Sequence, residues 1–180
     1  MPDRALVRID TPLLVLGPGP ATLVAAKVAG ACGQPCLLVG HEIVGDDVPV
    51  ELDPAAVAVL ERHGLLDVFR PHLLAADPLT VAPREFEEVL KRHCIADLNV
   101  GVYDRMTLAG RAVTGRSLHG VLTDGRSSWE LAADTKIDAD ALAVALPAAV
   151  TDGEAAALEA IAALRSRRDH DRGVGPRVRT

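Results

Sequence analysis

The stretch that most constrains the fold of this chain is Thr11–Gly40, which has the order strand, glycine-rich turn, helix, strand. Leu13–Leu16 is a short, unbroken apolar run, which is typical of a parallel strand buried on both faces. The turn Gly17–Thr22 (GPGPAT) follows directly, and an alanine- and valine-rich segment of helical length comes next. A second apolar run, Leu37–Val39, then ends at Gly40. The pattern therefore predicts a strand-helix-strand unit that opens a parallel sheet.

The turn resembles the G-x-G-x-x-G sequence of dinucleotide-binding folds. In that motif the first glycine allows a tight turn, the second lets the backbone approach a pyrophosphate, and the third lets the helix pack close to the strand. Gly17 and Gly19 are present here, but Thr22 stands at the third glycine. The acidic residue expected at the end of the second strand, about 20 residues later, would hold the ribose hydroxyls. Gly40 stands in its place. Glu42, two residues further on, could reach a ribose if the strand end is bulged, but we favour its interpretation as a solvated loop acid.

The sequence thus predicts the scaffold of a nucleotide-binding fold that lacks two of its ligand-binding features. Any strand-to-helix turn could use the same two glycines, so the motif alone does not settle whether a nucleotide binds. If one binds, the helix N-terminus would supply its N–H groups and the positive end of its dipole. The candidate cofactor-binding residues of this turn are Gly17, Gly19, Pro20, Ala21 and Thr22.

The composition is that of one globular domain. The 180 residues are 49% hydrophobic and 24% charged, which is ordinary for a soluble protein. Aromatic residues make up only 2% and the net charge is −6, so we expect no nucleic-acid partner, because such readers use stacking side chains and cationic surfaces. The sequence contains neither a long apolar run nor a signal-peptide pattern, so we expect a cytoplasmic protein without membrane contacts.

The sequence assigns no metal site and no catalytic residue. Cys32, Cys36 and His41 could be drawn as metal ligands, but a zinc site needs a further pair of ligands that is not nearby. A hydrolase nucleophile is not expected either, because G-x-S-x-G is missing. Glu87 and Glu88 are adjacent on a predicted helix and face different directions, so we expect them to form a solvated helix face and not an acid/base pair.

Local signals predict the later elements. Asp53-Pro54 should begin a helix, because aspartate caps free N–H groups and proline suits the first helical position. Pro83–His93 has helical spacing with Phe86 in the core. Asp124-Gly125 lies between alternating runs and predicts a hairpin turn. Thr151–Glu154 is a capping-box pattern and is expected to open the last helix.

We expect two regions. Residues 1–164 form a single Rossmann-like domain of the FAD/NAD(P)-binding type. Residues 165–180 contain six arginines and two aspartates and little to bury, which predicts a basic, disordered tail.

Four segments carry a family resemblance. Besides the glycine turn, they are Glu51–Phe69 (ELDPAAVAVLERHGLLDVF), Pro83–Leu90 (PREFEEVL), Leu118–Arg126 (LHGVLTDGR) and Ile137–Ala141 (IDADA). In this order they resemble the N-terminal part of the FAD-dependent aromatic hydroxylases, halogenases and geranylgeranyl reductases. The resemblance implies that Arg84 lies beside a flavin, and that Ala141 replaces the last glycine of a G-A-D-G motif.

The resemblance also implies a fold and a cofactor. The fold class would be α/β and Rossmann-like, a parallel sheet with helices on both faces plus a small antiparallel β-hairpin, and FAD would be the cofactor. The chain ends where the family continues into a substrate sheet and a second flavin-contacting Gly-Asp motif.

Three functions follow as expectations. The first is a degenerate, non-catalytic binding or partner subunit for an oxidoreductase or a biosynthetic enzyme. The second is an FAD- or nucleotide-dependent, monooxygenase-like oxidoreductase whose site another chain completes. The third is an unrelated small α/β protein. A protein partner or a homo-oligomer is expected, with exposed apolar surface where the missing half would dock.

Overall fold

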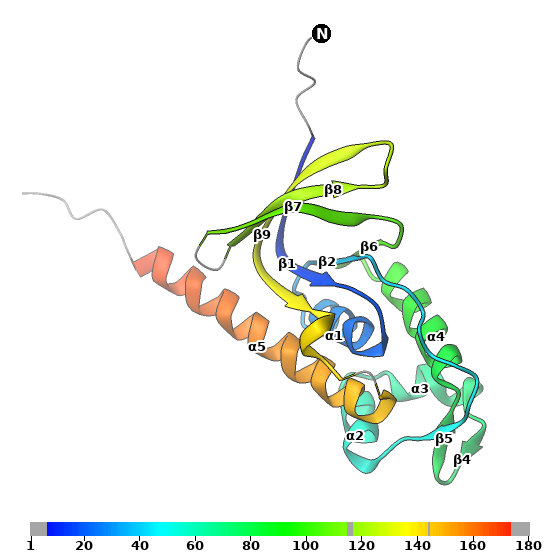
Figure 1. Ribbon diagram of the computed structural model, residues 1–180. Coiled ribbons are helices and arrows are strands. Elements are labelled where there is room, and N and C mark those ends of the chain that lie inside the picture. Colours follow the sequence, from blue (N-terminus) through cyan, green and yellow to red (C-terminus); the bar gives the residue numbers. More distant parts are fainter. Residues whose placement is uncertain (1–6, 115–116, 144, 174–180) are drawn as a thin grey trace, which may run out of the picture.

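The computed structural model describes residues 7–114, 117–143 and 145–173 (Figure 1). The strands are β1 Arg8–Leu16, β2 Cys36–Val39, β3 Val50–Glu51, β4 Ala75–Ala76, β5 Leu79–Val81, β6 Val100–Tyr103, β7 Thr107–Thr114, β8 Ser117–Thr123 and β9 Ser128–Asp138. The helices are α1 Pro20–Ala31, α2 Pro54–Arg62, α3 Leu66–Phe69, α4 Pro83–Ile95 and α5 Leu146–Gly173, with 3-10 turns at Arg70–His72 and Ala139–Ala141.

The main sheet has the strand order β6-β2-β1-β9-β8-β7. The first four of these strands are parallel, and Leu14 of β1 lies opposite Leu37 of β2 and Lys136 of β9. Taken in chain order, these four strands stand third, second, first and fourth, which is the order of the Rossmann fold. The strands β9, β8 and β7 continue the sheet in antiparallel fashion, and β3, β5 and β4 form a separate small antiparallel sheet. The predicted fold class is therefore confirmed.

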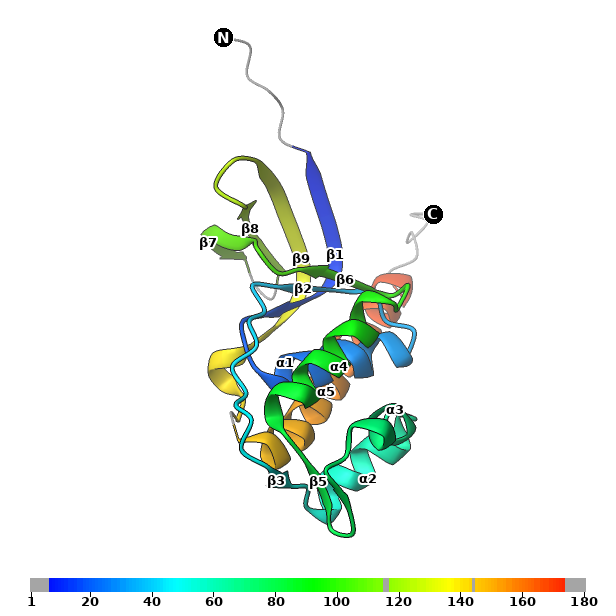
Figure 2. The same ribbon diagram turned by 90° about the vertical axis from the view of Figure 1, so that its right-hand side faces the viewer.

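The two faces of the sheet are covered differently. α1, α4 and α5 lie together on one face (Figure 2). Leu14 and Leu16 point to the other face, where Leu118, Leu122 and Leu131 of the antiparallel strands pack on them. The prediction of helices on both faces was wrong in this detail, because the apolar side chains of β8 and β9 fill the second face in place of helices.

Several local predictions are confirmed. Asp53 caps α2, and its side chain accepts a hydrogen bond from the N–H of Ala56 at 2.7 Å. Asp124-Gly125 forms the turn between β8 and β9. Phe86 on α4 is fully buried and stacks on Phe69, with ring centroids 4.4 Å apart.

The last helix is longer than the sequence suggested. α5 begins at Leu146, so the expected start at Thr151 was wrong; Pro147 already suits a first helical turn. Gly153 lies within the helix, where a Cβ would come within 2.4 Å of the Ala21 carbonyl oxygen, a clash that its glycine avoids as α5 packs on α1. The helix runs to Gly173, so the disorder predicted from Arg165 is wrong for residues 165–173, and residues 174–180 lie outside the described part. None of the described helices combines the length and apolarity needed to span a bilayer.

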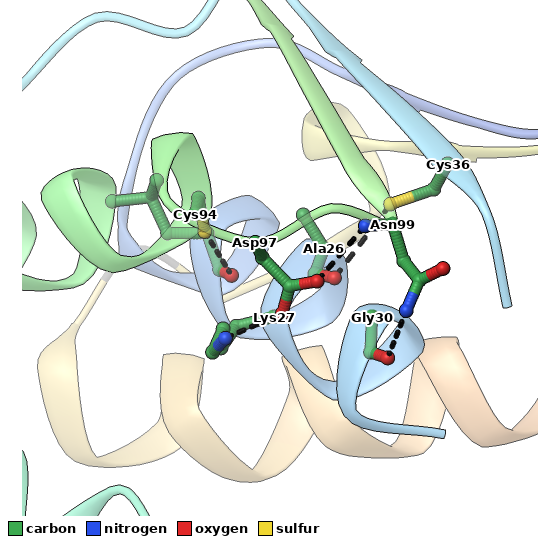
Figure 3. Close-up of polar contacts among 8 residues, drawn as sticks. Ala26, Lys27, Gly30, Cys36, Cys94, Asp97 and Asn99 are labelled. Carbon is green, nitrogen blue, oxygen red and sulfur yellow. Dashed lines mark hydrogen bonds and ion pairs between the residues drawn. The ribbon is translucent and has the colours of Figure 1, made fainter. Parts of the chain in front are cut away.

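Polar contacts fix α1 against its neighbours (Figure 3). Lys27 of α1 forms an ion pair with Asp97 at 2.5 Å, and both side chains are largely buried. The thiols of Cys36 and Cys94 donate to carbonyls of α1, Cys36 to that of Ala26. Burial raises the pKa of each thiol to about 12, so both stay protonated and serve packing. These contacts hold the middle of α1 against β2 and the C-terminal end of α4.

Candidate functional site

The glycine turn lies at the carboxyl edge of the parallel strands, between β1, β2 and β9. Gly17 and Gly19 both have φ of +97°, a conformation that glycine adopts without strain. The N–H of Gly17 donates to the Val39 carbonyl at 3.0 Å, and a Cβ on Gly17 would lie 2.7 Å from that of Ala139. The turn thus occupies the crevice where α/β sheets of this kind bind ligands.

Thr22 closes the turn from inside. Its side chain is fully buried, and its hydroxyl lies 2.9 Å from the Gly19 carbonyl oxygen and 3.1 Å from that of Gly17. A third glycine would leave this space open. The threonine therefore stabilises the turn through its own carbonyls, a role that requires no ligand.

The start of α1 is covered by the chain itself. The loop of residues 41–48 passes over it, and the N–H of Gly19 donates to the Glu42 carbonyl at 3.3 Å. Gly19, Pro20 and Ala21 are all buried. Pro20 also removes one of the N–H groups that the first turn of a helix normally leaves free. The N–H of the second glycine and the surface around it are thus occupied within the chain.

A buried carboxylate holds this loop in place. Glu87 of α4 is fully buried and accepts hydrogen bonds from the N–H groups of Gly45 at 2.7 Å and Val44 at 3.1 Å. Burial raises the pKa of Glu87, and the two backbone hydrogen bonds oppose that shift only in part. The N–H of Arg84 adds a bond to the Asp46 carbonyl at 2.9 Å. The loop is therefore attached to α4 at three points.

Arg84, the residue that the resemblance places beside a flavin, is held by the same loop. Its Nε lies 3.3 Å from Oδ1 of Asp47, and both side chains are exposed at the surface. The structure does not bring Arg84 into the hollow beside the glycine turn.

That hollow has a volume of about 260 Å³, slightly below the range of about 300–1,000 Å³ usual for ligand pockets. Asp138 and Asp140 line it, Asp138 is paired with Lys136 at 3.2 Å, and none of the lining residues that the structure describes is cationic. Carboxylates can accept hydrogen bonds from hydroxyl groups but repel a pyrophosphate. The remaining lining residues are Leu16, Gly17, Pro18, Val39, Gly40, Met106, Thr107, Leu108 and Ala139.

The residues present do not fit a bound FAD in this arrangement. The N–H of Gly19 is engaged, the start of α1 is covered, and the open hollow is acidic. Gly40 departs from the family pattern in conformation as well as in charge: its φ is +66°, which an acidic residue adopts only with strain.

Sequence reasoning missed a buried polar cluster around His41, the first residue of the loop of residues 41–48. His41 is 1% exposed, and neither ring nitrogen has a hydrogen-bond partner within the described residues. Lys91 of α4 and Asp104, which follows β6, form an ion pair at 2.7 Å close to it. Burial lowers the pKa of His41 to about 4, Lys91 adds to this shift, and Asp104 opposes it. Its position two residues after the end of β2 was the sequence signal for this histidine.

Comparison with known proteins gives a fold but no close relative. No family model matches the chain, and no curated protein matches it. Solved structures do match. The p-nitrophenol 4-monooxygenase PnpA from Pseudomonas putida DLL-E4 is 19% identical with a TM-score of 0.59, and the match covers 74% of this chain and 41% of that one.

Two further structures give the same result. The flavin-dependent monooxygenase PieE, solved in complex with FAD and substrate, is 16% identical with a TM-score of 0.61, and the match covers 71% of this chain and 30% of that one. The anhydrotetracycline hydroxylase OxyS from Streptomyces rimosus is 14% identical with a TM-score of 0.58, and the shares are 72% and 31%. The chain spans less than half the length of these proteins, and its resemblance to the FAD-dependent hydroxylase group is confirmed at the level of the Rossmann-like fold.

Proposed function

We propose that this chain is a flavoprotein-like domain that acts as a non-catalytic binding or partner subunit of an oxidoreductase or a biosynthetic enzyme. The observation that carries this proposal is the covered start of α1. In a dinucleotide-binding fold this helix end must be open to the pyrophosphate. Here the N–H of Gly19 is bonded to the Glu42 carbonyl, and Glu87 holds the covering loop in place.

Two further features support a binding role without catalysis. Thr22 uses its hydroxyl within the turn, and Gly40 carries no acid for a ribose. The parallel sheet and its core need none of the missing ligand contacts, so the fold can persist without a cofactor. A fold of this kind hosts many functions, and only its sites decide which one is present.

A second candidate is an FAD- or nucleotide-dependent, monooxygenase-like oxidoreductase whose site a second polypeptide completes. The favouring observation is the Gly17–Gly19 turn, which keeps the conformation needed for close approach of a ligand, with Pro18 exposed beside the hollow. In this case a partner chain would displace the loop of residues 41–48 and supply the cationic groups that the hollow lacks.

Titration of the purified chain with FAD, followed by flavin fluorescence, tests the proposal. We expect no saturable binding up to about 100 µM, a concentration at which a site of ordinary cofactor affinity would be filled. The Glu87→Gln variant, which weakens the hold on the loop, should gain affinity relative to Glu88→Gln, the matched control on the same helix. A wild-type chain that binds FAD stoichiometrically would overturn the proposal.

Co-expression with the products of neighbouring genes separates the two candidates. A stable complex is expected in both cases. A negative charge at the exposed Pro18 would repel a pyrophosphate, so Pro18→Glu should remove flavin from the complex only if this chain helps to hold it. If the variant leaves both complex and flavin unchanged, the non-catalytic role stands; if flavin is lost, the second candidate replaces it.

A further inference from the structure

The strand β9 has an unfinished edge. On one side it pairs with β1 from Glu130 to Asp138, but on the other side its pairing with β8 ends at Ala133. Within the described part of the chain, no strand pairs with Thr135–Ile137 on that side. An unpaired strand edge presents backbone N–H and C=O groups that can pair with another chain.

A hollow of about 670 Å³ lies beside this edge, between β9 and α5. Ala156, Ala160 and Ala163 recur on one face of α5 and line the hollow together with Ile137 and Leu142. Their small side chains leave space next to the strand. At the rim the carbonyl of Asp134 accepts a hydrogen bond from the Arg167 side chain, at the point where strand pairing has stopped.

We propose that an extended segment of a partner polypeptide adds to β9 along Thr135–Ile137 and places its alternate side chains against Ala156, Ala160 and Ala163. The backbone groups of the edge favour a strand over a helix, because a helix satisfies its own N–H and C=O groups. The match to the solved monooxygenases covers only 30–41% of their chains, so the same fold is elsewhere accompanied by much more polypeptide. The inference rests on the proposed role as a partner subunit.

A second copy of this chain fits the edge less well. Antiparallel pairing centred on Lys136 would place that lysine opposite its own copy, and Asp134 opposite Asp138 of the copy. Like charges directly opposite each other destabilise a strand pair. A partner strand with small apolar residues at alternate positions has no such conflict.

Site-specific photo-cross-linking in the native host is the first step of the test. A benzoylphenylalanine introduced at Glu159, an exposed residue of the hollow's lining, should label one discrete polypeptide, and the same group at Ala162, which is exposed and outside that lining, should not. Equal labelling at both positions, no labelling at Glu159, or labelling of a second copy of this chain would overturn the proposal.

The second step uses a fluorescein-labelled peptide that contains the ten residues around the cross-linked position of the partner polypeptide. This peptide is added to the full chain of this protein. Its binding should slow exchange about tenfold or more at those amides of Thr135–Ile137 that do not already donate to β1. Ala163→Arg should weaken binding about tenfold or more, while Ala162→Arg should change it less than about twofold. A peptide that binds without protecting these amides would refute strand addition. FAD binding by the chain alone would refute the proposed non-catalytic role. It would not refute strand addition at β9, which the cross-linking and amide-exchange experiments test separately.

Discussion

His41 should make this protein less stable as the pH falls from about 7 toward 4. Its folded-state pKa is about 4, below the usual histidine value of 6.5, because it is buried and lies near Lys91. Below about pH 6.5 the unfolded chain therefore binds a proton at this site that the folded chain does not. The stability contributed by neutral His41 is complete above that pH and is lost as the pH falls toward 4.

The size of the loss follows from the two pKa values. A difference of about 2.5 units corresponds to roughly 3 kcal/mol in full, of which about 2 kcal/mol is lost between about pH 7 and about pH 5. The His41→Leu variant removes the titrating group and two buried nitrogens that have no hydrogen-bond partner among the described residues. It should lack this part of the pH dependence and should be as stable as the wild type, or more stable, at pH 7.

Urea unfolding followed by circular dichroism at several pH values measures the effect for both proteins. Carboxylates also titrate toward the acid end, so the difference between wild type and variant is the quantity that counts. Equal losses in the two proteins between pH 7 and pH 5 would refute the reasoning, as would an NMR titration that finds the ring protonating near pH 6.5.

Three other substitutions test the local account by urea unfolding. Thr22→Val removes the hydroxyl bonded to the turn's carbonyls and should cost about 1–2 kcal/mol; no loss would mean that these bonds do not stabilise the turn. Gly40→Glu places a side chain at φ +66° and should lower the free energy of unfolding by about 1–2 kcal/mol without creating FAD binding. A gain in FAD affinity would contradict the inference that backbone strain at this position prevents ribose binding. Glu154→Gln weakens contacts of 2.5 Å to Arg62 and 2.7 Å to His63, which tie α2 to α5, and should cost about 1–3 kcal/mol. Burial raises the pKa of Glu154, but the hydrogen bonds from Arg62 and His63 outweigh it and lower the pKa, so this stability is lost as the pH falls; a variant with unchanged acid sensitivity would contradict this.

The sequence predicted the parts of the fold that are determined locally. The apolar run Leu13–Leu16 and the two glycines that follow specify a strand and a turn, and Asp53 and Asp124 act through bonds to backbone a few residues away. The length of α5 could not be found this way. Thr151–Glu154 indicates a helix start in sequence, and only the close approach of α1 explains Gly153 inside a helix that is already under way.

The sequence predicted where the candidate site lies, but it did not predict that a loop of the chain itself covers it. The glycine turn gave its place at the carboxyl edge of the sheet. The loop over α1 depends on Glu87, which accepts hydrogen bonds from the amides of Gly45 and Val44, 42 and 43 residues away in sequence. The expected solvated position of Glu87 is wrong, because its side chain is fully buried. Contacts over such a distance have no periodic or motif signal in a single sequence.

The central claim is that the N–H of Gly19 is already bonded within the chain and is not available to a phosphate. The most direct test follows the amide signal of Gly19 by NMR while FAD is added to the wild-type protein. We expect its chemical shift and exchange rate to stay unchanged up to about 1 mM FAD, the concentration that would half-fill a site of about −4 kcal/mol. A saturable shift of this signal, with Val44 and Gly45 released from Glu87, would contradict the account.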